Sequence, residues 1–270
     1  FLGPNGAGKT TTIRLLMGLL RPSGGSARIV GMDCWSQSTE VKRLIGYLPG
    51  EFNVDPALTG AQVIEYLGHL SGGVDQELVK RLVQRFELDP SKRFRDYSRG
   101  NKQKVGLIQA FMRRPRLLIL DEPTAGLDPL NQQEFYALVQ EARESGSSIF
   151  LSSHILPEVE HSCDRVGIVR EGELVKIDHV STLKEMRRHV IEIVFPGAPE
   201  LEWFAGLPNV SDVKLLNDGT TVQLTAQQEM ADVIQVAARH QATSMTARQP
   251  SLEEVFLRYY EPDSGEGRTE

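Results

Sequence analysis

The sequence predicts an α/β fold with a largely parallel sheet, followed by a smaller α+β domain. Strand and helix patterns alternate along the first two-thirds of the chain, the order that builds a parallel sheet. Residues 117–120 are aliphatic at every position, as expected of a strand covered on both faces. Charge also divides the chain, because residues 190–270 carry 13 acidic and 5 basic side chains. This asymmetry indicates two units of different character.

Hydrophobic periodicity and helix-ending residues define the elements of the first unit. The expected helices are 10–20, 59–71, 75–88, 98–112 and 129–144, and the expected strands are 27–30, 117–120 and 149–151. Residues 165–170 and 173–177 flank Glu171-Gly172 and predict a hairpin. We expect this unit to span residues 1–180, with a helical subdomain at about 51–113.

A short helix beginning at Thr182 is expected to link this unit to a second one at residues 181–260, because Thr182 and Glu185 have capping-box spacing. The second unit reads as strand 190–195, helix 200–206, strands 210–216 and 220–225 around an Asn217-Asp218-Gly219 turn, helix 227–240 and strand 243–248. The order βαββαβ predicts a ferredoxin-like domain. A last helix begins at Ser251 and either docks on its own domain or forms a dimerisation face. Residues 261–270 hold no apolar anchor and predict a disordered tail.

Composition restricts the function classes. The formal net charge of the 270 residues is −6, which disfavours a protein built to coat nucleic acid. No apolar run approaches the roughly 20 residues of a membrane helix. Cys34 and Cys163 lack metal-ligand spacing, as buried thiols of a reducing compartment would. The chain starts at Phe1 directly before a glycine-rich loop, so we expect upstream residues, including the first strands, to be missing.

That loop fits the phosphate-binding pattern G-x-x-x-x-G-K-[ST]. It comprises Gly3, Pro4, Asn5, Gly6, Ala7, Gly8, Lys9 and Thr10, with Thr11 next in the helix that follows. Glycines let backbone N–H groups converge on phosphate oxygens, and the helix directs its positive N-terminus at the same place. Lys9 supplies a cation for the β- and γ-phosphates of ATP, and the Thr10 hydroxyl suits Mg²⁺.

The matching carboxylates are Asp121 and Glu122, which follow the aliphatic run 117–120 directly. A buried strand delivers such residues to its carboxyl end, where open α/β sheets bind ligands. Asp121 is suited to hold Mg²⁺, and Glu122 is suited to polarise the attacking water. Together the two motifs predict a P-loop NTPase.

The segment Tyr97-Ser98-Arg99-Gly100-Asn101-Lys102-Gln103-Lys104 resembles the signature motif of the ATPase subunits of ABC transporters. Ala125-Gly126-Leu127-Asp128 resembles the D-loop of that family, and His154 after Ser152-Ser153 resembles its switch histidine. The resemblance covers about residues 1–180. It implies a head-to-tail dimer in which Ser98 and Gly100 of one copy close on the γ-phosphate held by Lys9 of the other. It also implies that Asp128 lies at that interface and that His154 assists Glu122.

Two departures from the family pattern stand out. Arg99 replaces the first glycine of the signature, a change that resembles type-two ABC exporters. Gly50 stands where the family has the glutamine that ligates Mg²⁺ and couples to the membrane subunit. The neighbouring Glu51 either substitutes in part or is a solvated loop residue. The residue that stacks on adenine in the family would lie upstream of Phe1.

The acidic second unit resembles the accessory domain of bacterial drug-exporter ATPases. We therefore expect an ATPase subunit that energises export through a separate permease, at the cytoplasmic face of the plasma membrane and without nucleic acid. The region between Gly50 and Tyr97 would contact the permease. One alternative is a soluble ABC-family ATPase acting on nucleic acid or ribosomes, and another is a small-molecule P-loop kinase, which the signature and His154 disfavour. In an exporter ATPase, the basic cluster at residues 93–104 would be a solvated face or part of the signature. In an ATPase that acts on nucleic acid, it would be a patch that binds the phosphate backbone.

Overall fold

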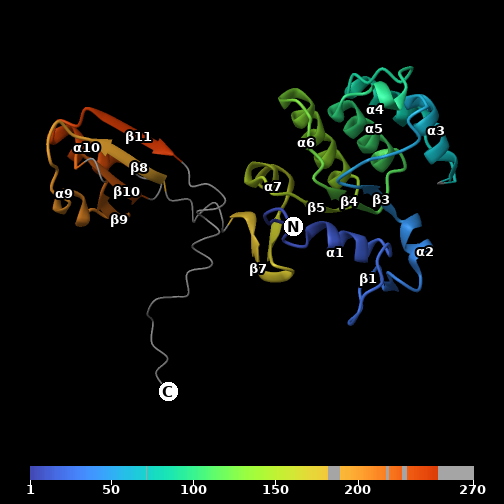
Figure 1. The fold of residues 1–270 in the computed structure, drawn as a ribbon, viewed down its shortest axis with the longest axis horizontal. Coiled ribbons are helices and arrows are strands. Elements are labelled where there is room, and N and C mark those ends of the chain that lie inside the picture. Colours follow the sequence, from blue (N-terminus) through green and yellow to red (C-terminus); the bar gives the residue numbers. More distant parts are fainter. Residues whose placement is uncertain (71, 182–188, 217–218, 227–229, 249–270) are drawn as a thin grey trace. The chain divides into compact units, whose positions relative to one another are not determined.

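The computed structural model describes residues 1–70, 72–181, 189–216, 219–226 and 230–248. The chain divides into two compact units, Phe1–Val180 and Ser181–Glu270 (Figure 1). The helix expected from Thr182, the Asn217-Asp218 turn, the helix expected from Ser251 and the tail lie outside the described residues.

The first unit alternates helices and strands as its sequence pattern predicts. In chain order it holds α1 (Lys9–Leu16), β1 (Arg28–Ile29), β2 (Met32–Asp33), α2 (Ser38–Arg43), β3 (Ile45–Leu48), α3 (Gly60–Leu70), α4 (Gln76–Arg85), a 3₁₀ turn (Phe94–Asp96), α5 (Arg99–Phe111), β4 (Leu117–Asp121), α6 (Pro129–Glu144), β5 (Ser148–Ser152), α7 (Leu156–Ser162), β6 (Arg165–Arg170) and β7 (Glu173–His179). Strands β3, β4 and β5 pair in parallel, and β6 and β7 form the expected antiparallel hairpin. The α/β prediction is confirmed.

Leu2 connects these strands at the point where the glycine-rich loop begins. It forms parallel bridges to Ser153, just beyond β5, and to Ile168 in β6. Its side chain is 1% exposed. The loop at residues 3–8 therefore leaves the sheet at the carboxyl end of a central position, beside the ends of β4 and β5.

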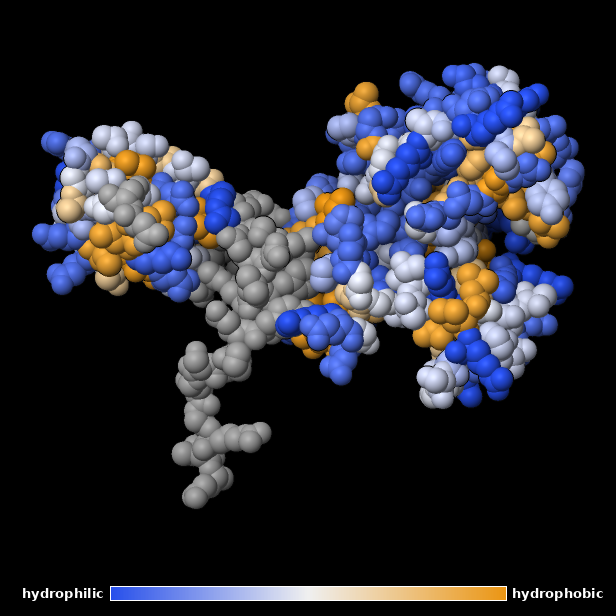
Figure 2. All heavy atoms as spheres, in the orientation of Figure 1, coloured by the Kyte–Doolittle hydropathy of each residue, from blue (hydrophilic) through white to orange (hydrophobic). Residues whose placement is uncertain are grey.

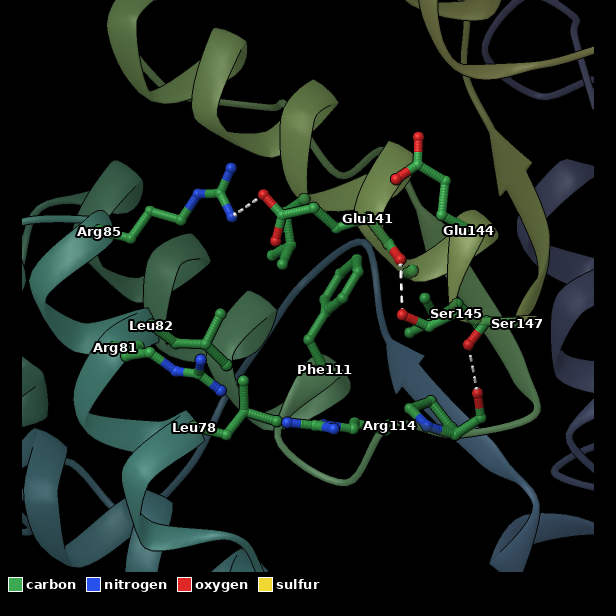
Figure 3. Close-up of a pocket in the computed structure, with 14 residues that line it drawn as sticks. Leu78, Arg81, Leu82, Arg85, Phe111, Arg114, Glu141, Glu144, Ser145 and Ser147 are labelled. Carbon is green, nitrogen blue, oxygen red and sulfur yellow. Dashed lines mark hydrogen bonds and ion pairs between the residues drawn. The ribbon is translucent and has the colours of Figure 1, made fainter.

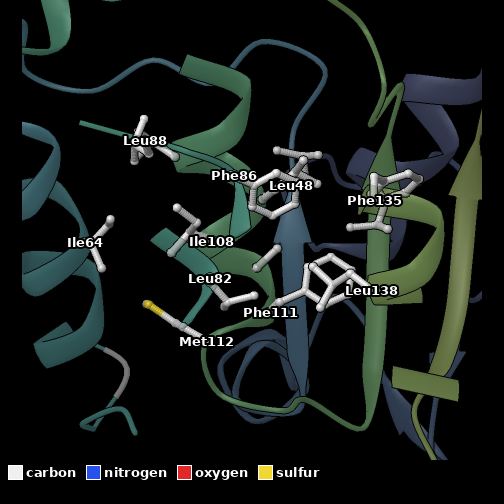
Figure 4. Packing of buried hydrophobic residues seen from close by; sticks show 14 of the residues in the cluster. Leu48, Ile64, Leu82, Phe86, Leu88, Ile108, Phe111, Met112, Phe135 and Leu138 are labelled. Carbon is white, nitrogen blue, oxygen red and sulfur yellow. The ribbon is translucent and has the colours of Figure 1, made fainter. Parts of the chain in front are cut away.

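Strand β4 is aliphatic throughout because both of its faces are covered. Leu118 and Leu120 pack into a cluster with α4, α5 and α6, which includes Phe86 and Phe135 (Figure 4). Ile119, which points the other way, packs into a second cluster with Ile13 of α1. Successive side chains of a strand alternate between faces, so this division makes a sheet with helices on both sides.

Some elements differ from the sequence-based expectation. Helix α1 ends at Leu16 rather than residue 20, because Gly18 adopts a φ of 58° and the Leu19 N–H returns to the Arg14 carbonyl. Strand β3 was not predicted. Its pattern is broken by Gly46, where a Cβ would lie 2.0 Å from the Ala110 carbonyl oxygen. Close packing against α5 therefore explains why the strand lacks an aliphatic side chain there.

The second unit has the predicted order of elements. It holds β8 (His189–Val194), α9 (Glu202–Ala205), β9 (Val210–Leu215), β10 (Thr221–Ala226), α10 (Ala231–Arg239) and β11 (Ser244–Arg248). The strands pair antiparallel in the order β11-β8-β10-β9, which confirms the ferredoxin-like fold. Alternate residues Ile191 and Ile193 of β8 pack in one core with Phe204 of α9 and Val233 of α10.

On the face of each unit that Figure 2 shows, hydrophobic residues occur in small groups between hydrophilic ones. Within the described residues, no helix is both long enough and apolar enough to cross a membrane.

Candidate functional site

The glycine-rich loop is packed where side chains would not fit. A Cβ on Gly3 would lie 2.4 Å from the Val169 carbonyl oxygen of β6. Gly6 and Gly8 have φ angles of 81° and 104°, in the left-handed region that favours glycine. The Gly172 N–H donates to the Ala7 carbonyl at 2.9 Å, which ties the loop to the β6–β7 turn. The loop conformation is thus set by the sheet behind it.

Helix α1 begins at Lys9, directly after the loop. The N–H groups of its first turn, which includes Thr10 and Thr11, have no partners within a helix and give its N-terminus a partial positive charge. The Lys9 side chain is almost fully buried, and its Nζ donates to the carbonyls of Gly3 at 2.7 Å and Pro4 at 3.2 Å. These positive groups around the loop make a site for phosphate. Pro4, Asn5 and Gly6 are exposed at its rim.

Thr10 and Asp121 are brought together as the sequence predicts. The Thr10 hydroxyl donates to Asp121 Oδ2 at 2.8 Å, and the Ser152 hydroxyl donates to Asp121 Oδ1. Asp121 is fully buried at the end of β4. A hydroxyl and a single carboxylate fit Mg²⁺, which takes oxygen ligands and completes its shell with water and phosphate oxygens. Among the described residues there is no cluster of three or more His, Cys, Asp or Glu side chains that would hold a metal by protein ligands alone.

Gly50 lies beside the same carboxylate. A Cβ on Gly50 would be 3.2 Å from Asp121 Oδ2. A side chain at this position would therefore begin next to the Asp121 carboxylate, and glycine leaves that space open.

Glu122 and His154 also meet as predicted. His154 Nδ1 lies 2.6 Å from Glu122 Oε2, and Lys9 Nζ lies 3.3 Å from Glu122 Oε1. Glu122 has a φ of 50°, in the left-handed region, and its N–H donates to the Ser152 carbonyl at 3.1 Å. The carboxylate is 20% exposed, so it faces both the cation of the loop and solvent. A water held between Glu122 and a phosphate bound by Lys9 would be placed for attack.

A buried carboxyl group that the sequence analysis missed supports the His154 loop. Glu158 of α7 is 1% exposed and accepts hydrogen bonds from the hydroxyls of Ser153 and Thr124. Burial raises the pKa of Glu158 above its ordinary value. Its place four residues after His154, directly after Ile155-Leu156-Pro157, was the available sequence signal.

Ser98, Gly100 and Asp128 lie at the starts of two other helices. The Ser98 hydroxyl caps α5 by accepting from the Asn101 N–H at 3.2 Å. Asp128 caps α6 by accepting from the Asn131 N–H at 3.0 Å, and this bond lowers the pKa of Asp128. A Cβ on Gly100 would lie 2.5 Å from the Gly126 carbonyl oxygen. The signature and D-loop segments are thus packed together in one chain.

A second residue that the sequence analysis did not select is Gln103 of α5. Its side chain is 5% exposed. Its Nε2 donates to the carbonyls of Glu122 at 3.1 Å and Pro123 at 3.0 Å. Its position inside the signature segment, one turn after Gly100, was the available signal.

A cavity of about 470 Å³ lies elsewhere, at the amino ends of β4 and β5 (Figure 3). Its lining includes Arg81, Phe111 and Ser147. Two further lining residues, Arg85 of α4 and Glu141 of α6, form an ion pair with 2.8 Å between nitrogen and oxygen. It is separated from Asp121 by the length of β4, so it is not part of the phosphate site.

The phosphate loop, the buried Asp121 with its hydroxyl partner and the Glu122–His154 pair form the arrangement expected of the nucleotide site of a P-loop ATPase. Residues 1–125 match the family described as ABC transporter. Residues 180–260 match the family described as ATP-binding protein DrrA1-3-like, C-terminal domain.

Relatives that align along most of the chain belong to the same family. An ABC transporter ATP-binding protein of Alkalihalophilus pseudofirmus is 34% identical over 95% of this chain and 97% of its own length. The linearmycin resistance ATP-binding protein LnrL of Bacillus subtilis is 30% identical over 95% of this chain and 87% of its own. A solved ATP-binding subunit of an ABC transporter is 30% identical and aligns with a TM-score of 0.62, over 68% of this chain and 79% of that chain. The chain belongs to the ABC transporter ATP-binding proteins, and its enzymatic class is that of an ABC-type ATPase.

Proposed function

We propose that this chain is the ATP-hydrolysing subunit of an exporter, working as a dimer with a separate membrane permease. The observation that carries the proposal is the cluster of Lys9, Glu122 and His154 beside the Thr10–Asp121 pair. The cluster combines a cation that can bind phosphate, a base and a metal site, all beside the carboxyl ends of adjacent strands.

In this mechanism Lys9 and the first-turn N–H groups of α1 bind the phosphates of ATP. Thr10 and Asp121 would hold Mg²⁺, which neutralises phosphate charge when bound. Glu122 accepts a proton from the attacking water, and His154 orients the Glu122 carboxylate through its Nδ1 contact. The negative charge of the phosphates attracts Lys9. The ion pair between Lys9 and Glu122 keeps the Glu122 carboxylate beside the same phosphates.

Ser98 and Gly100 support the proposed dimer. Both lie at the N-terminus of the 13-residue helix α5, which is a suitable place for a phosphate. Their contacts within the chain are with Asn101 and Gly126 rather than with the phosphate loop. We propose that they complete the site of a second copy, with Asp128 at the same interface.

Export through a permease at the cytoplasmic face of the plasma membrane is supported by the second unit and by the relatives. LnrL confers resistance to linearmycin according to its name, and it aligns along both units of this chain. The region between Gly50 and Tyr97, which includes α3 and α4, is the proposed permease contact.

The test is a Glu122→Gln variant of the full-length protein. Because Gln cannot accept the proton of water, bound ATP should persist and hold two copies together. Size-exclusion chromatography with ATP and Mg²⁺ should show a dimer that ADP does not support. The matched control is Glu40→Gln, an exposed residue of α2, which should hydrolyse ATP as the wild type does.

A Glu122→Gln protein that remains a monomer and turns over ATP normally would refute the proposal. ATPase stimulation by DNA or ribosomes, but not by a membrane partner, would favour the soluble alternative.

A further inference from the structure

We infer that Gln103 is a positioning residue that ties the signature segment to Glu122 of its own chain and thereby links the two ATP sites of the dimer. The link between sites rests on the proposed dimer function. The contact between Gln103 and the backbone of Glu122 is present within a single chain.

The contact is specific to an amide side chain. Gln103 Nε2 carries two protons and lies 3.1 Å from the Glu122 carbonyl oxygen and 3.0 Å from that of Pro123. The side chain is 5% exposed, so water does not readily replace it. A side chain without a donor would remove this bond from the buried Pro123 carbonyl and would leave the Glu122 carbonyl with the Ala125 N–H, which donates to it at 3.1 Å.

The backbone that Gln103 holds is unusual. Glu122 has a φ of 50°, a conformation that residues other than glycine adopt at an energetic cost and keep only when their surroundings enforce it. The N–H of Glu122 is fixed by the Ser152 carbonyl at 3.1 Å, on the β5 side. The Glu122 carbonyl accepts from Gln103 Nε2 on the α5 side and from the Ala125 N–H, at 3.1 Å, within its own turn. The direction in which the carboxylate meets Lys9 and His154 therefore depends on these three bonds, and the one from Gln103 ties it to α5.

The same face of α5 carries the signature glycine. Gly100 lies three residues before Gln103, which places the two on one side of the helix. A Cβ on Gly100 would lie 2.5 Å from the Gly126 carbonyl oxygen, and one on Gly126 would lie 3.2 Å from Arg99 Cγ. The start of α5 and residues 122–126 are packed so closely that movement of one displaces the other.

In the proposed dimer, Ser98 and Gly100 of one copy touch the nucleotide held by the other copy. A shift of α5 on nucleotide binding there would reach Glu122 of its own chain through Gln103. Occupancy of one site would thus set the position of the base in the other site, which is a coupling between two distinct sites.

The first test is Gln103→Met, which keeps the length of the side chain and removes the donor. Misplacement of Glu122 should lower kcat by on the order of ten- to a hundredfold, while KM for ATP changes by less than about twofold. The matched control is Gln109→Met. Gln109 lies on the same helix and also donates through Nε2 to a backbone carbonyl, that of Tyr47. The control should keep kcat close to the wild-type value.

The second test uses mixed dimers purified through two different affinity tags, each with one Glu122→Gln chain, so that one site alone hydrolyses ATP. Gln103→Met is placed either in the chain with the intact Glu122 or in the chain with Glu122→Gln. The inference predicts a low kcat for the first arrangement and a near-normal kcat for the second. Both dimers hold the same substitutions, so an effect on folding would lower both alike.

Equal loss in the two arrangements, or a greater loss when Gln103→Met lies in the Glu122→Gln chain, would overturn the inference. The second result would mean that Gln103 acts only through the signature that faces the partner's nucleotide. If no ATP-dependent dimer forms, the proposed function fails, and the link between sites fails with it.

Discussion

Glu158→Gln tests whether a buried carboxyl group beneath the His154 loop makes the stability of the first unit depend on pH. Glu158 Oε2 accepts from the Ser153 hydroxyl, the Thr124 hydroxyl also donates to the carboxyl group, and among the described residues Oε1 has no hydrogen-bond partner. The Gln side chain has the same shape and no charge. The substitution therefore removes the titration and keeps the packing.

Burial of Glu158 determines whether the free energy of unfolding rises or falls with pH. Burial raises the pKa of Glu158 above its ordinary value of 4.5, so the folded chain binds this proton more tightly than the unfolded chain. The free energy of unfolding is then fully retained below pH 4.5 and falls as pH rises toward and through the folded-state pKa. A single group changes this free energy by at most about 1.4 kcal/mol per pH unit. The Gln variant lacks that loss, so its stability relative to the wild type should increase with pH.

The assay is urea unfolding at a series of pH values from about 4.5 upward, because the difference between variants cancels the titration of groups they share. Of the two Trp residues in the sequence, Trp35 lies in the first unit and Trp203 in the second. Fluorescence in a Trp203→Phe background therefore reports on the first unit. Glu144→Gln, an exposed change, is the control and should give a pH-independent difference. A Glu158→Gln difference that is constant with pH would refute the reasoning.

Two further predictions concern the phosphate site. Thr10→Val removes the hydroxyl that donates to Asp121, so the Mg²⁺ concentration for half-maximal ATPase activity should rise by about tenfold or more, whereas Thr10→Ser should stay near the wild type. Equal behaviour of the two variants in a MgCl₂ titration would contradict the proposed metal site. Gly3→Ala should lower the free energy of unfolding by about 1–3 kcal/mol, because its Cβ would lie 2.4 Å from the Val169 carbonyl oxygen. Gly24→Ala, whose Cβ would enter open space, is the control in urea unfolding, and equal stabilities of the two variants would count against tight packing of the loop.

Much of the first unit could be predicted because its signals are local. The aliphatic run of β4, the Ser98 cap of α5 and the Asp128 cap of α6 depend on residues within a few positions of each other. Strand β3 could not be found in this way. Gly46 is required by the approach of the Ala110 carbonyl, which is 64 positions away in the chain, and it removes an aliphatic residue from the pattern.

In the candidate site, too, some residues have a local sequence signal and others depend on contacts between distant segments. The pairs Thr10–Asp121 and Glu122–His154 were predicted because each member follows a recognisable motif at the carboxyl end of a strand. Gln103 and Glu158 follow no such signal. Their importance comes from backbone and hydroxyl partners that folding brings near, and polar residues of these types are common on any helix surface.

Spacing along the chain is enough to predict the phosphate loop, the two carboxylates proposed to bind metal and to act as the base, the alternation of strand and helix, and the acidic βαββαβ unit. Tertiary packing places Gln103 against the left-handed Glu122 backbone, buries Glu158 beside Ser153 and sets Gly100 against Gly126. Each of these depends on close packing between segments distant in the chain. The distances and burial that result are properties of the folded interior, and no local pattern specifies them.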